Sequence, residues 1–341
     1  MESNILIIGG TGVVGKTIAR ILQDRNPTLS IKVGSRNPSG SSTNIWVDVA
    51  NPDSFQSILE NKITMIILSV NDQENHILKF AIQHGIDYLD ITKPTPDLMK
   101  AYTIVRSGPV NSRIIFSSGW MGGIVPGLVE MLADHSTKID DVKLYVYYST
   151  RDLAGKSSAH FMAENVAKPF VCYKNNQPQP VRHFLNSENY QFSFDIGKRQ
   201  SYNFDVPDLF ILNQIEKIPN VSVKMTYDSK VITWLLGTFQ TLRIFDLLSL
   251  KQRQTIFGGS GNGDQAVFEI IIKQKGEVRK LSLQSERGQA ELTALSAVLH
   301  TEEILKNELD NKIYFSHQIH RSENLFTALK SHPGINIKIL Y

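Results

Sequence analysis

The feature that most constrains the fold is a glycine-rich turn near the start of the chain. An apolar run, residues 4–8, leads directly into Gly10-x-Gly12-x-x-Gly15, and a helical pattern follows. Gly10 allows a tight turn out of a strand, Gly12 lets the backbone approach a pyrophosphate, and Gly15 lets the helix pack closely on the strand. The helix N-terminus then faces the diphosphate. This stretch predicts a dinucleotide site, for which the expected contacts are Gly10, Thr11, Gly12, Val13, Val14 and Gly15.

The end of the second expected strand, residues 31–34, indicates which dinucleotide is bound. A carboxylate about 20 residues after the glycines is typical of NAD sites, where it accepts the ribose hydroxyls. This chain has Ser35 and Arg36 there instead. No carboxylate repels a 2′-phosphate, and Arg36 can pair with one through charge-assisted hydrogen bonds. We therefore favour NADP (NADPH) over NAD; the alternative is a solvent-facing Arg36 that tolerates either cofactor.

Two further polar residues follow apolar strands in this half of the chain. Asp48 closes the expected strand 45–49, where it either reaches the adenine amino group or caps the helix beginning near Asp53. Asn71 follows the apolar strand 64–70, and ligands gather at the carboxyl ends of parallel strands, so we expect Asn71 to line the cofactor groove. The strand–helix alternation up to residue 117 predicts a doubly wound parallel sheet.

Length and composition limit the class of protein. A chain of 341 residues exceeds what one hydrophobic core usually supports, so about two domains are expected. The formal net charge is only +3 and the cations are scattered, which argues against nucleic acid as a partner. The single cysteine, Cys172, rules out an intramolecular disulfide and a multi-cysteine metal site, and no histidine spacing suits a metal.

The pattern changes in the second half of the chain. Residues 144–148, 221–227, 266–272 and 278–283 are strand-like, and they are not separated by a helix each time. Such a succession predicts a largely antiparallel sheet. The fold class is therefore α/β: an N-terminal Rossmann domain with a doubly wound parallel sheet, followed by an α+β second domain.

Residues 231–248 form the most apolar stretch outside the strands. Gln240, Arg243 and Asp246 interrupt it, whereas a spanning helix needs about 20 residues with few charges. Its apolar residues recur at helical spacing, which predicts a buried helix or a subunit-interface helix. We therefore expect a homodimer and no membrane association, with membrane contact as the minor alternative. The first strand follows Met1 almost at once, so we expect no signal peptide and a cytoplasmic location.

Three segments carry a family resemblance. Besides the N-terminal glycines, residues 81–91 are similar to an A-x-x-x-G-x-x-Y-x-D pattern, and residues 122–128 look like a G-x-x-P-G-L signature. In this order and spacing they resemble the saccharopine dehydrogenase family in the broad sense, which includes saccharopine reductases, lysine dehydrogenases and carboxynorspermidine synthases. The resemblance thins between about residues 170 and 285 and returns weakly in 288–309 and 312–315.

The resemblance implies a domain order. A Rossmann NAD(P)-binding domain, 1–123, is followed by an α+β substrate and dimerisation domain, 124–287, that covers its active-site edge. A C-terminal segment, 288–341, returns to the Rossmann domain.

The resemblance also implies a chemistry. The family's characteristic reaction transfers hydride between a nicotinamide and a C–N bond, joining an amine to a carbonyl compound or the reverse, so the chain is expected to be an oxidoreductase acting on CH–NH donors. Its substrate would be a small, amino-acid-derived molecule that carries carboxylates. Cationic side chains and helix N-termini would bind these carboxylates. The candidate substrate residues are Arg151, Lys156, Ser157, Ser158, Arg182, Gly122 and Gly123.

Three residues are candidates for the general acid or base. Asp90 lies at the end of its expected strand, and Lys93 follows three residues later. Lys93 can donate a proton if it is desolvated near the nicotinamide. His160, in the first helix of the second domain, is another candidate, and its alternative is a structural hydrogen bond.

Two other functions remain open at this stage. One is an NADP-dependent reductase acting on C=O or C=C, although the Tyr-x-x-x-Lys pair of short-chain reductases is missing: neither Tyr88 nor Tyr102 has Lys four residues on. The other is a redox sensor that binds NADP without turnover.

Overall fold

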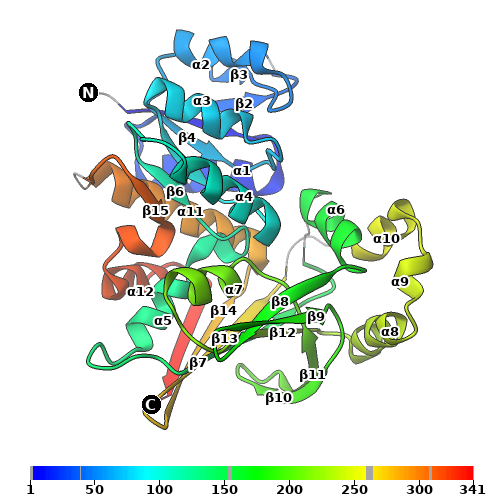
Figure 1. The fold of residues 1–341 in the computed structure, drawn as a ribbon. Coiled ribbons are helices and arrows are strands. Elements are labelled where there is room, and N and C mark those ends of the chain that lie inside the picture. The colour runs from blue at the N-terminus through cyan, green and yellow to red at the C-terminus, as the bar shows by residue number, and fades with distance from the viewer. Residues whose placement is uncertain (1–2, 39, 153–155, 259–263, 307–308, 341) are drawn as a thin grey trace. The chain divides into compact units, whose positions relative to one another are not determined.

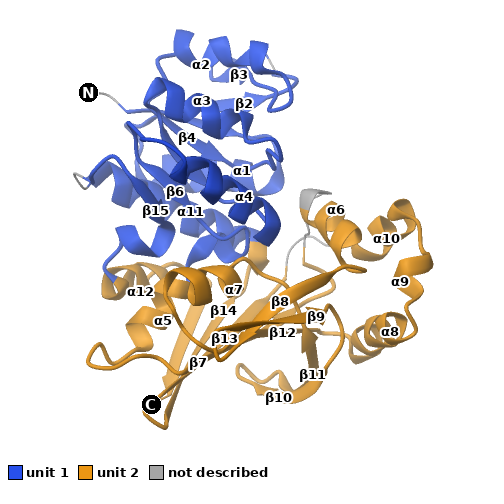
Figure 2. Cartoon of the chain, viewed as in Figure 1, with its two compact units in different colours: residues 1–124, 290–321 blue, residues 125–289, 322–341 orange. Residues whose placement is uncertain are grey.

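A computed structural model describes residues 3–38, 40–152, 156–258, 264–306 and 309–340, without the side chains of Lys156 and Ser157. The chain forms two compact units (Figure 2). Unit 1 comprises residues 1–124 and 290–321, and unit 2 comprises residues 125–289 and 322–341.

Unit 1 contains a seven-stranded sheet in the order β15-β6-β5-β4-β1-β2-β3, with every described pair parallel (Figure 1). Its strands are β1 (Asn4–Ile8), β2 (Ser30–Ser35), β3 (Asn44–Trp46), β4 (Met65–Leu68), β5 (Asp87–Asp90), β6 (Ile114–Phe116) and β15 (Ile313–Phe315). All four residues of β4 are buried, as expected for a parallel strand covered on both faces. The predicted doubly wound sheet is confirmed.

The helices of unit 1 begin and end where local residues favour it. They are α1 (Val13–Arg25), α2 (Gln56–Glu60), α3 (His76–His84), α4 (Thr95–Arg106) and most of α11 (Gly288–Lys306), with the short 3-10 turns η1 (Pro52–Phe55), η2 (Met121–Gly123) and η4 (Ser316–Ile319). Helix α3 ends at Gly85, whose φ of 64° suits glycine. Pro96 lies in the first turn of α4, where its missing N–H costs no helical hydrogen bond.

The chain returns to unit 1 through α11 and β15. Arg25 donates to both carboxylate oxygens of Glu302, at 2.8 and 2.7 Å, and Arg20 pairs with Glu291 at 2.9 Å, so α1 and α11 are joined along their length. Strand β15 extends the sheet beside β6. The last 20 residues, however, belong to unit 2, because β16 (Ile335–Leu340) pairs with β14. The expectation that all of 288–341 returns to the Rossmann domain is therefore wrong for this part.

Unit 2 contains a nine-stranded sheet with the main order β10-β11-β12-β7-β13-β14-β16 (Figure 1). Neighbours are antiparallel except β12 and β7, so the predicted largely antiparallel sheet is confirmed. The strands are β7 (Asp141–Tyr148), β8 (Pro169–Lys174), β9 (Gln177–Arg182), β10 (Glu188–Phe192), β11 (Gly197–Asn203), β12 (Val221–Tyr227), β13 (Ala266–Gln274), β14 (Glu277–Ser285) and β16.

The helices of unit 2 include the predicted apolar segment. They are α5 (Val125–Leu132), α6 (Lys156–Asn165), α7 (Asp208–Phe210), the π-turn η3 (Ile211–Ile215), α8 (Lys230–Thr241), α9 (Ile244–Leu247), α10 (Leu250–Phe257) and α12 (Ser322–Lys330). The segment 231–248 is helical but breaks at Arg243, which adopts a φ of 57°. One side of it is exposed, so it is not a fully buried helix. No helix of the described chain has the length and apolarity to cross a membrane.

Candidate functional site

The parallel sheet of unit 1 changes direction of winding between β1 and β4. Ligands of doubly wound sheets bind at the carboxyl edge beside such a switch point. The loop after β1 and the loop after β4 meet there: Ser69 donates its hydroxyl to the Ile8 carbonyl at 2.8 Å. A Cβ on Gly15 would lie 2.4 Å from the Gly9 oxygen and 2.8 Å from Ser69 Oγ, so only glycine fits. Ser69, which sequence reasoning missed, thus helps to close the glycine turn.

The N-terminus of α1 has the properties of an anion site. Gly12 is its extended N-cap, no side chain caps the helix, and no acidic residue lies in the first turn. The N–H groups of the first turn have no acceptor within the helix and carry the positive end of its dipole. Thr11, Gly12 and Val13 are exposed beside them. This arrangement fits a bound diphosphate.

The end of β2 supplies two groups that suit the ribose side of the cofactor. Gly9 N donates to the Gly34 carbonyl at 3.0 Å, and this hydrogen bond holds the end of β2 against the glycine turn. The Ser35 hydroxyl is buried and has no hydrogen-bond partner in the described structure. The Arg36 side chain is exposed, and the described residues include no carboxylate in an ion pair with it. An unsatisfied hydroxyl beside an unpaired guanidinium fits a phosphorylated ribose.

Asp48 and Asn71 flank this region. The 3-10 turn near Asp53 is capped by Asn51, which accepts from Asp53 N at 3.1 Å, so the cap expected from Asp48 is wrong. Asp48 instead accepts from Ala50 N at 3.1 Å, and its contact with adenine stays a prediction. Asn71 donates to Asp97 at 3.3 Å, while its Oδ1 is buried without a partner. That free acceptor is available to a ligand at the edge.

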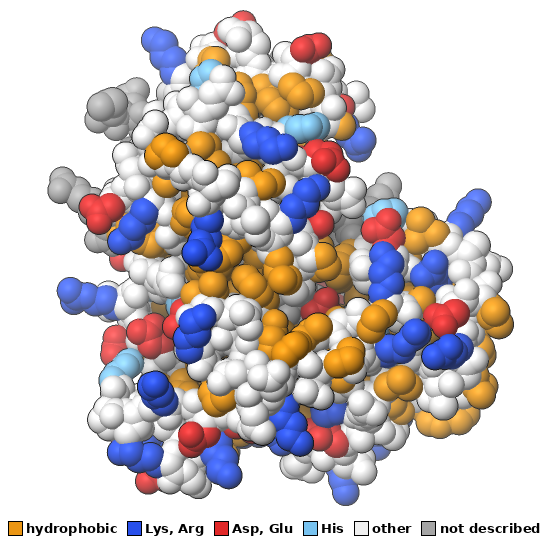
Figure 3. Space-filling view, in the orientation of Figure 1, with side chains coloured by type: hydrophobic (Ala, Val, Ile, Leu, Met, Phe, Trp, Pro, Cys, Tyr) orange, Lys and Arg blue, Asp and Glu red, His pale blue; other side chains and the backbone are white. Residues whose placement is uncertain are grey.

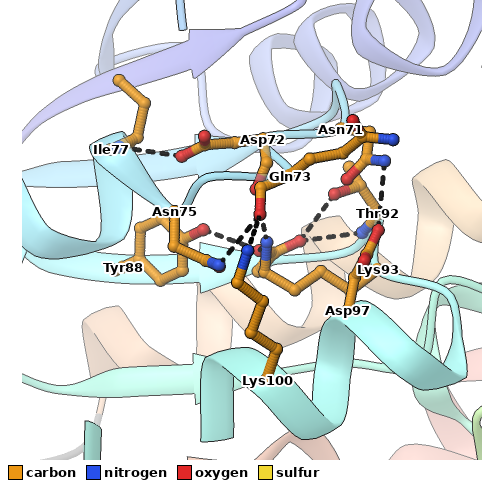
Figure 4. Close-up of polar contacts among 11 residues, drawn as sticks. Asn71, Asp72, Gln73, Asn75, Ile77, Tyr88, Thr92, Lys93, Asp97 and Lys100 are labelled. Carbon is orange, nitrogen blue, oxygen red and sulfur yellow. Dashed lines mark hydrogen bonds and ion pairs between the residues drawn. The ribbon is translucent and has the colours of Figure 1, made fainter. Parts of the chain in front are cut away.

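A fully buried ion pair lies after β5, at the same edge of the sheet (Figure 4). The Nζ of Lys93 is 3.3 Å from Asp90 Oδ2, and both side chains are at most 1% exposed. Tyr88 donates to Asp90 Oδ2 at 2.6 Å, and Thr92 donates to Oδ1 through its N–H and its hydroxyl, at 2.9 and 2.8 Å. Burial and the neighbouring carboxylates raise the pKa of Tyr88 well above its usual value, so Tyr88 stays a donor.

The Asp90–Lys93 pair also holds the loop after β4. Lys93 donates to the Asp72 carbonyl at 3.1 Å, and the Asp72 carboxylate accepts from Ile77 N at 2.8 Å at the start of α3 (Figure 4). The structure brings Asp90 and Lys93 together, as their spacing suggested. Their burial and their shared partners describe a support for two loops, and a proton-transfer role for Lys93 stays a prediction.

The Gly122–Gly123 turn follows β6. Met121, Gly122 and Gly123 have φ values of 50°, 60° and 73°, a left-handed run that is costly for residues other than glycine. His300 contacts the Gly122 carbonyl through Nε2 at 2.6 Å, and Ser316 donates to the Gly123 carbonyl at 3.0 Å. Both glycines are buried, so packing explains them without a substrate.

A histidine pair fixes this turn. Since His300 Nε2 must donate to the Gly122 carbonyl, its Nδ1 accepts, and His320 donates to it through Nε2 at 2.7 Å. Burial lowers the pKa of His300 to about 4, so the imidazole is neutral near pH 7. Sequence reasoning missed both histidines, because His300 lies 178 residues beyond Gly122 and His320 lies farther still along the chain.

The other candidate residues belong to unit 2. His160, 43% exposed, contacts Gln254 at 2.5 Å and lies 3.3 Å from Glu164. Arg151 is exposed, whereas Arg182 donates to the Ala167 carbonyl at 2.9 Å and pairs with Asp246 at 3.4 Å. The exposed Ser158 is described, but the side chains of Lys156 and Ser157 lie outside the described structure.

The sequence and the fold both match known proteins. Residues 5–106 match the family model of the saccharopine dehydrogenase NADP binding domain. No curated protein matches the sequence. Apo saccharopine dehydrogenase (L-Glu forming) from Saccharomyces cerevisiae is similar in structure, with a TM-score of 0.66 and 12% identity over 99% of this chain and 100% of that one. A DAP dehydrogenase from C. glutamicum, in complex with DAP, has a TM-score of 0.50 and 10% identity over 95% of each chain.

These matches define the class of protein. The chain has the fold of a saccharopine dehydrogenase-like oxidoreductase with an NAD(P)-binding N-terminal domain. Residues 5–106 are similar to saccharopine dehydrogenase NADP binding domains, and the resemblance to the saccharopine dehydrogenase family in the broad sense is confirmed.

Proposed function

We propose that the protein is an NADP-dependent oxidoreductase of the saccharopine dehydrogenase type. It would transfer hydride between NADP(H) and a C–N bond of a small, amino-acid-derived substrate that carries carboxylates. The observation that carries the cofactor part is the uncapped N-terminus of α1 beside Ser35 and Arg36. It lies in a domain whose family model is an NADP-binding one.

Different residues of unit 1 would bind different parts of NADP. The turn Gly10–Gly15 would bind the diphosphate through backbone N–H groups. Ser35 and Arg36 would bind the 2′-phosphate, and Asn71 and Asp48 would contact the groove and the adenine. When bound, the nicotinamide supplies or accepts the hydride.

The C–N part of the proposal draws support from the similar structures. One is a saccharopine dehydrogenase, and the other is a DAP dehydrogenase in complex with DAP. A fold similar to that of this chain is therefore used by two dehydrogenases with different names. The carboxylates of such a substrate need cationic partners. Of the two candidate arginines, Arg151 is the more available, because it is exposed, whereas Arg182 already pairs with Asp246. Lys156 and Ser157 keep their proposed roles.

Proton transfer must involve a group that meets the substrate. His160 is exposed enough to do so, and its Nε2 lies 3.3 Å from Glu164. Asp90 and Lys93 would support the edge on which the nicotinamide lies, since neither side chain reaches the surface. A homodimer and a cytoplasmic location stay predictions.

The direct test is a screen of NADPH oxidation that crosses amines and amino acids with 2-oxo acids and aldehydes. We expect NADPH consumption only when an amine and a carbonyl compound are both present. Turnover with a carbonyl compound alone would identify a C=O reductase and contradict the C–N assignment. Tight NADPH binding with no turnover in any pair would favour the redox sensor.

A further inference from the structure

The helices α8, α9 and α10, residues 230–257 and called the α8–α10 segment below, carry an unusual share of exposed apolar side chains. Of the 15 large hydrophobic residues exposed in the described chain, eight lie in this segment. They are Val231, Ile232, Trp234, Leu235, Leu242, Leu247, Leu250 and Ile256. Single exposed hydrophobic residues are normal, but such a concentration marks an interaction surface.

Packing within unit 2 explains only one side of α8. Thr233, Leu236 and Gly237 are buried, and a Cβ on Gly237 would lie 2.6 Å from the ring of Tyr202 in β11. The opposite side carries Leu235, which is 39% exposed, and Trp234 beside it is 55% exposed. The helix is thus apolar on both sides but packs against its own sheet on only one.

The exposed side continues beyond α8. Val231 is 65% exposed and Leu242 is 64% exposed, and Leu247 in α9 is 84% exposed. These side chains contribute little to the core of unit 2, so the fold itself does not require them to be apolar.

The α8–α10 segment also carries exposed cations. Lys230, Arg243 and Lys251 are exposed in the same segment. Its one carboxylate, Asp246, forms an ion pair with Arg182 from β9 at 3.4 Å. In Figure 3, hydrophobic and basic side chains alternate along the part of the surface formed by α8–α10. The segment therefore combines apolar area with net positive charge.

The positive charge of the segment bears on which partner covers it, a second copy of this chain or an anionic membrane. A two-fold dimer through this face would bring together two copies of the same net-positive surface, because the same patch of each subunit forms the contact. An anionic bilayer would accept the leucines and Trp234 at its interface and attract the lysines and arginines. We propose that the α8–α10 segment binds an anionic membrane surface and lies in its plane. The proposal is independent of the hydride chemistry of unit 1.

Vesicle flotation of the full-length protein tests the proposal. We expect binding to vesicles of equimolar phosphatidylcholine and phosphatidylserine, weaker binding at high salt, and little binding to phosphatidylcholine alone. Leu247→Glu and Arg243→Glu should each weaken binding about tenfold or more. Val278→Glu is the matched control, because Val278 is a 58% exposed apolar residue on β14, and it should leave binding within about twofold.

Three outcomes would overturn the proposal. The first is no binding of the wild type to the anionic vesicles, and the second is equal binding by wild type and Leu247→Glu. The third is a dimer in solution, measured by light scattering, that Leu247→Glu converts to a monomer, which would make a second copy the occupant. NADPH binding by each variant provides a check that it is folded, and the salt dependence of the wild type needs no variant.

Discussion

Two parts of the same sheet edge differ in whether their polar groups have partners within the protein. At the ends of β1 and β2, the first-turn N–H groups of α1 are uncapped, the Ser35 hydroxyl has no partner, and Arg36 is exposed. At the end of β5, Asp90 and Lys93 are buried, and each has hydrogen-bond or ion-pair partners within the protein. Unsatisfied groups are available to a ligand, whereas satisfied buried groups fix the positions of loops.

The difference matters because the two cations look alike in the sequence. Arg36 and Lys93 each follow a strand of the same parallel sheet. The two cations differ in the burial of the side chain and in its partners. Arg36 is exposed and is a candidate to bind a ligand, whereas Lys93 is buried, pairs with Asp90 and holds loops in place. Mutations at the two positions should therefore affect different quantities.

Lys93→Met should have the largest effect, on stability. It leaves the Asp90 carboxylate buried without its cation, and removing one partner of a buried pair costs about 3–5 kcal/mol in the free energy of unfolding. Lys100→Met is the matched control: Lys100 donates to the neighbouring Gln73 carbonyl at 3.2 Å, but its side chain is 51% exposed (Figure 4). Its loss should cost less than about 1 kcal/mol. Chemical denaturation measures both.

The contrast between these variants also separates the two roles of Lys93. If Lys93→Met keeps wild-type stability but loses turnover, then Lys93 is catalytic and the supporting role is wrong. Equal destabilisation by both methionine variants would mean that burial does not distinguish them.

The third part of the edge, the Gly122 turn, should respond to pH. The pKa of His300 is lowered to about 4 in the folded protein, against about 6.5 when unfolded. Between these values the unfolded state binds a proton that the folded state does not, so stability falls as the pH falls. At pH 5 the loss from His300 alone is about 2 kcal/mol relative to pH 7.5. Denaturation midpoints at the two pH values measure it.

His300→Gln should reduce this pH dependence, because glutamine can donate to Gly122 O and accept from His320 but does not titrate. His183 and His320, whose pKa values are lowered to about 3 and about 2, keep contributing in the variant. An unchanged pH dependence would contradict the assigned role of His300.

Much of the fold could be predicted from local pattern. Strands β4 and β6 of unit 1 are continuous apolar runs, and the strands of unit 2 that begin at Val221 and Ala266 are rich in apolar residues. Strands β8 and β9 could not be predicted, since β9 has the sequence QPQPVR and proline is tolerated only at an edge. Strand β16 was also missed, because its pairing with β14 is a long-range contact.

The candidate site could be predicted in part. The glycine turn and the residues after each strand follow from spacing and from the parallel sheet. The burial of Lys93, the engagement of Arg182 by Asp246 and the histidine support of Gly122 depend on partners distant in sequence. Single-sequence patterns contain no information on such partners.

The most direct test of the account compares NADPH and NADH affinity in the wild type and in Arg36→Ala. Arg106→Ala is the control, because Arg106 ends α4 at the opposite edge of the sheet. We predict that the wild type binds NADPH at least about tenfold more tightly than NADH, that Arg36→Ala removes most of this difference, and that Arg106→Ala does not. Equal affinities in the wild type, or a preference that survives Arg36→Ala, would contradict the claim that the open β1–β2 part of the edge binds the 2′-phosphate.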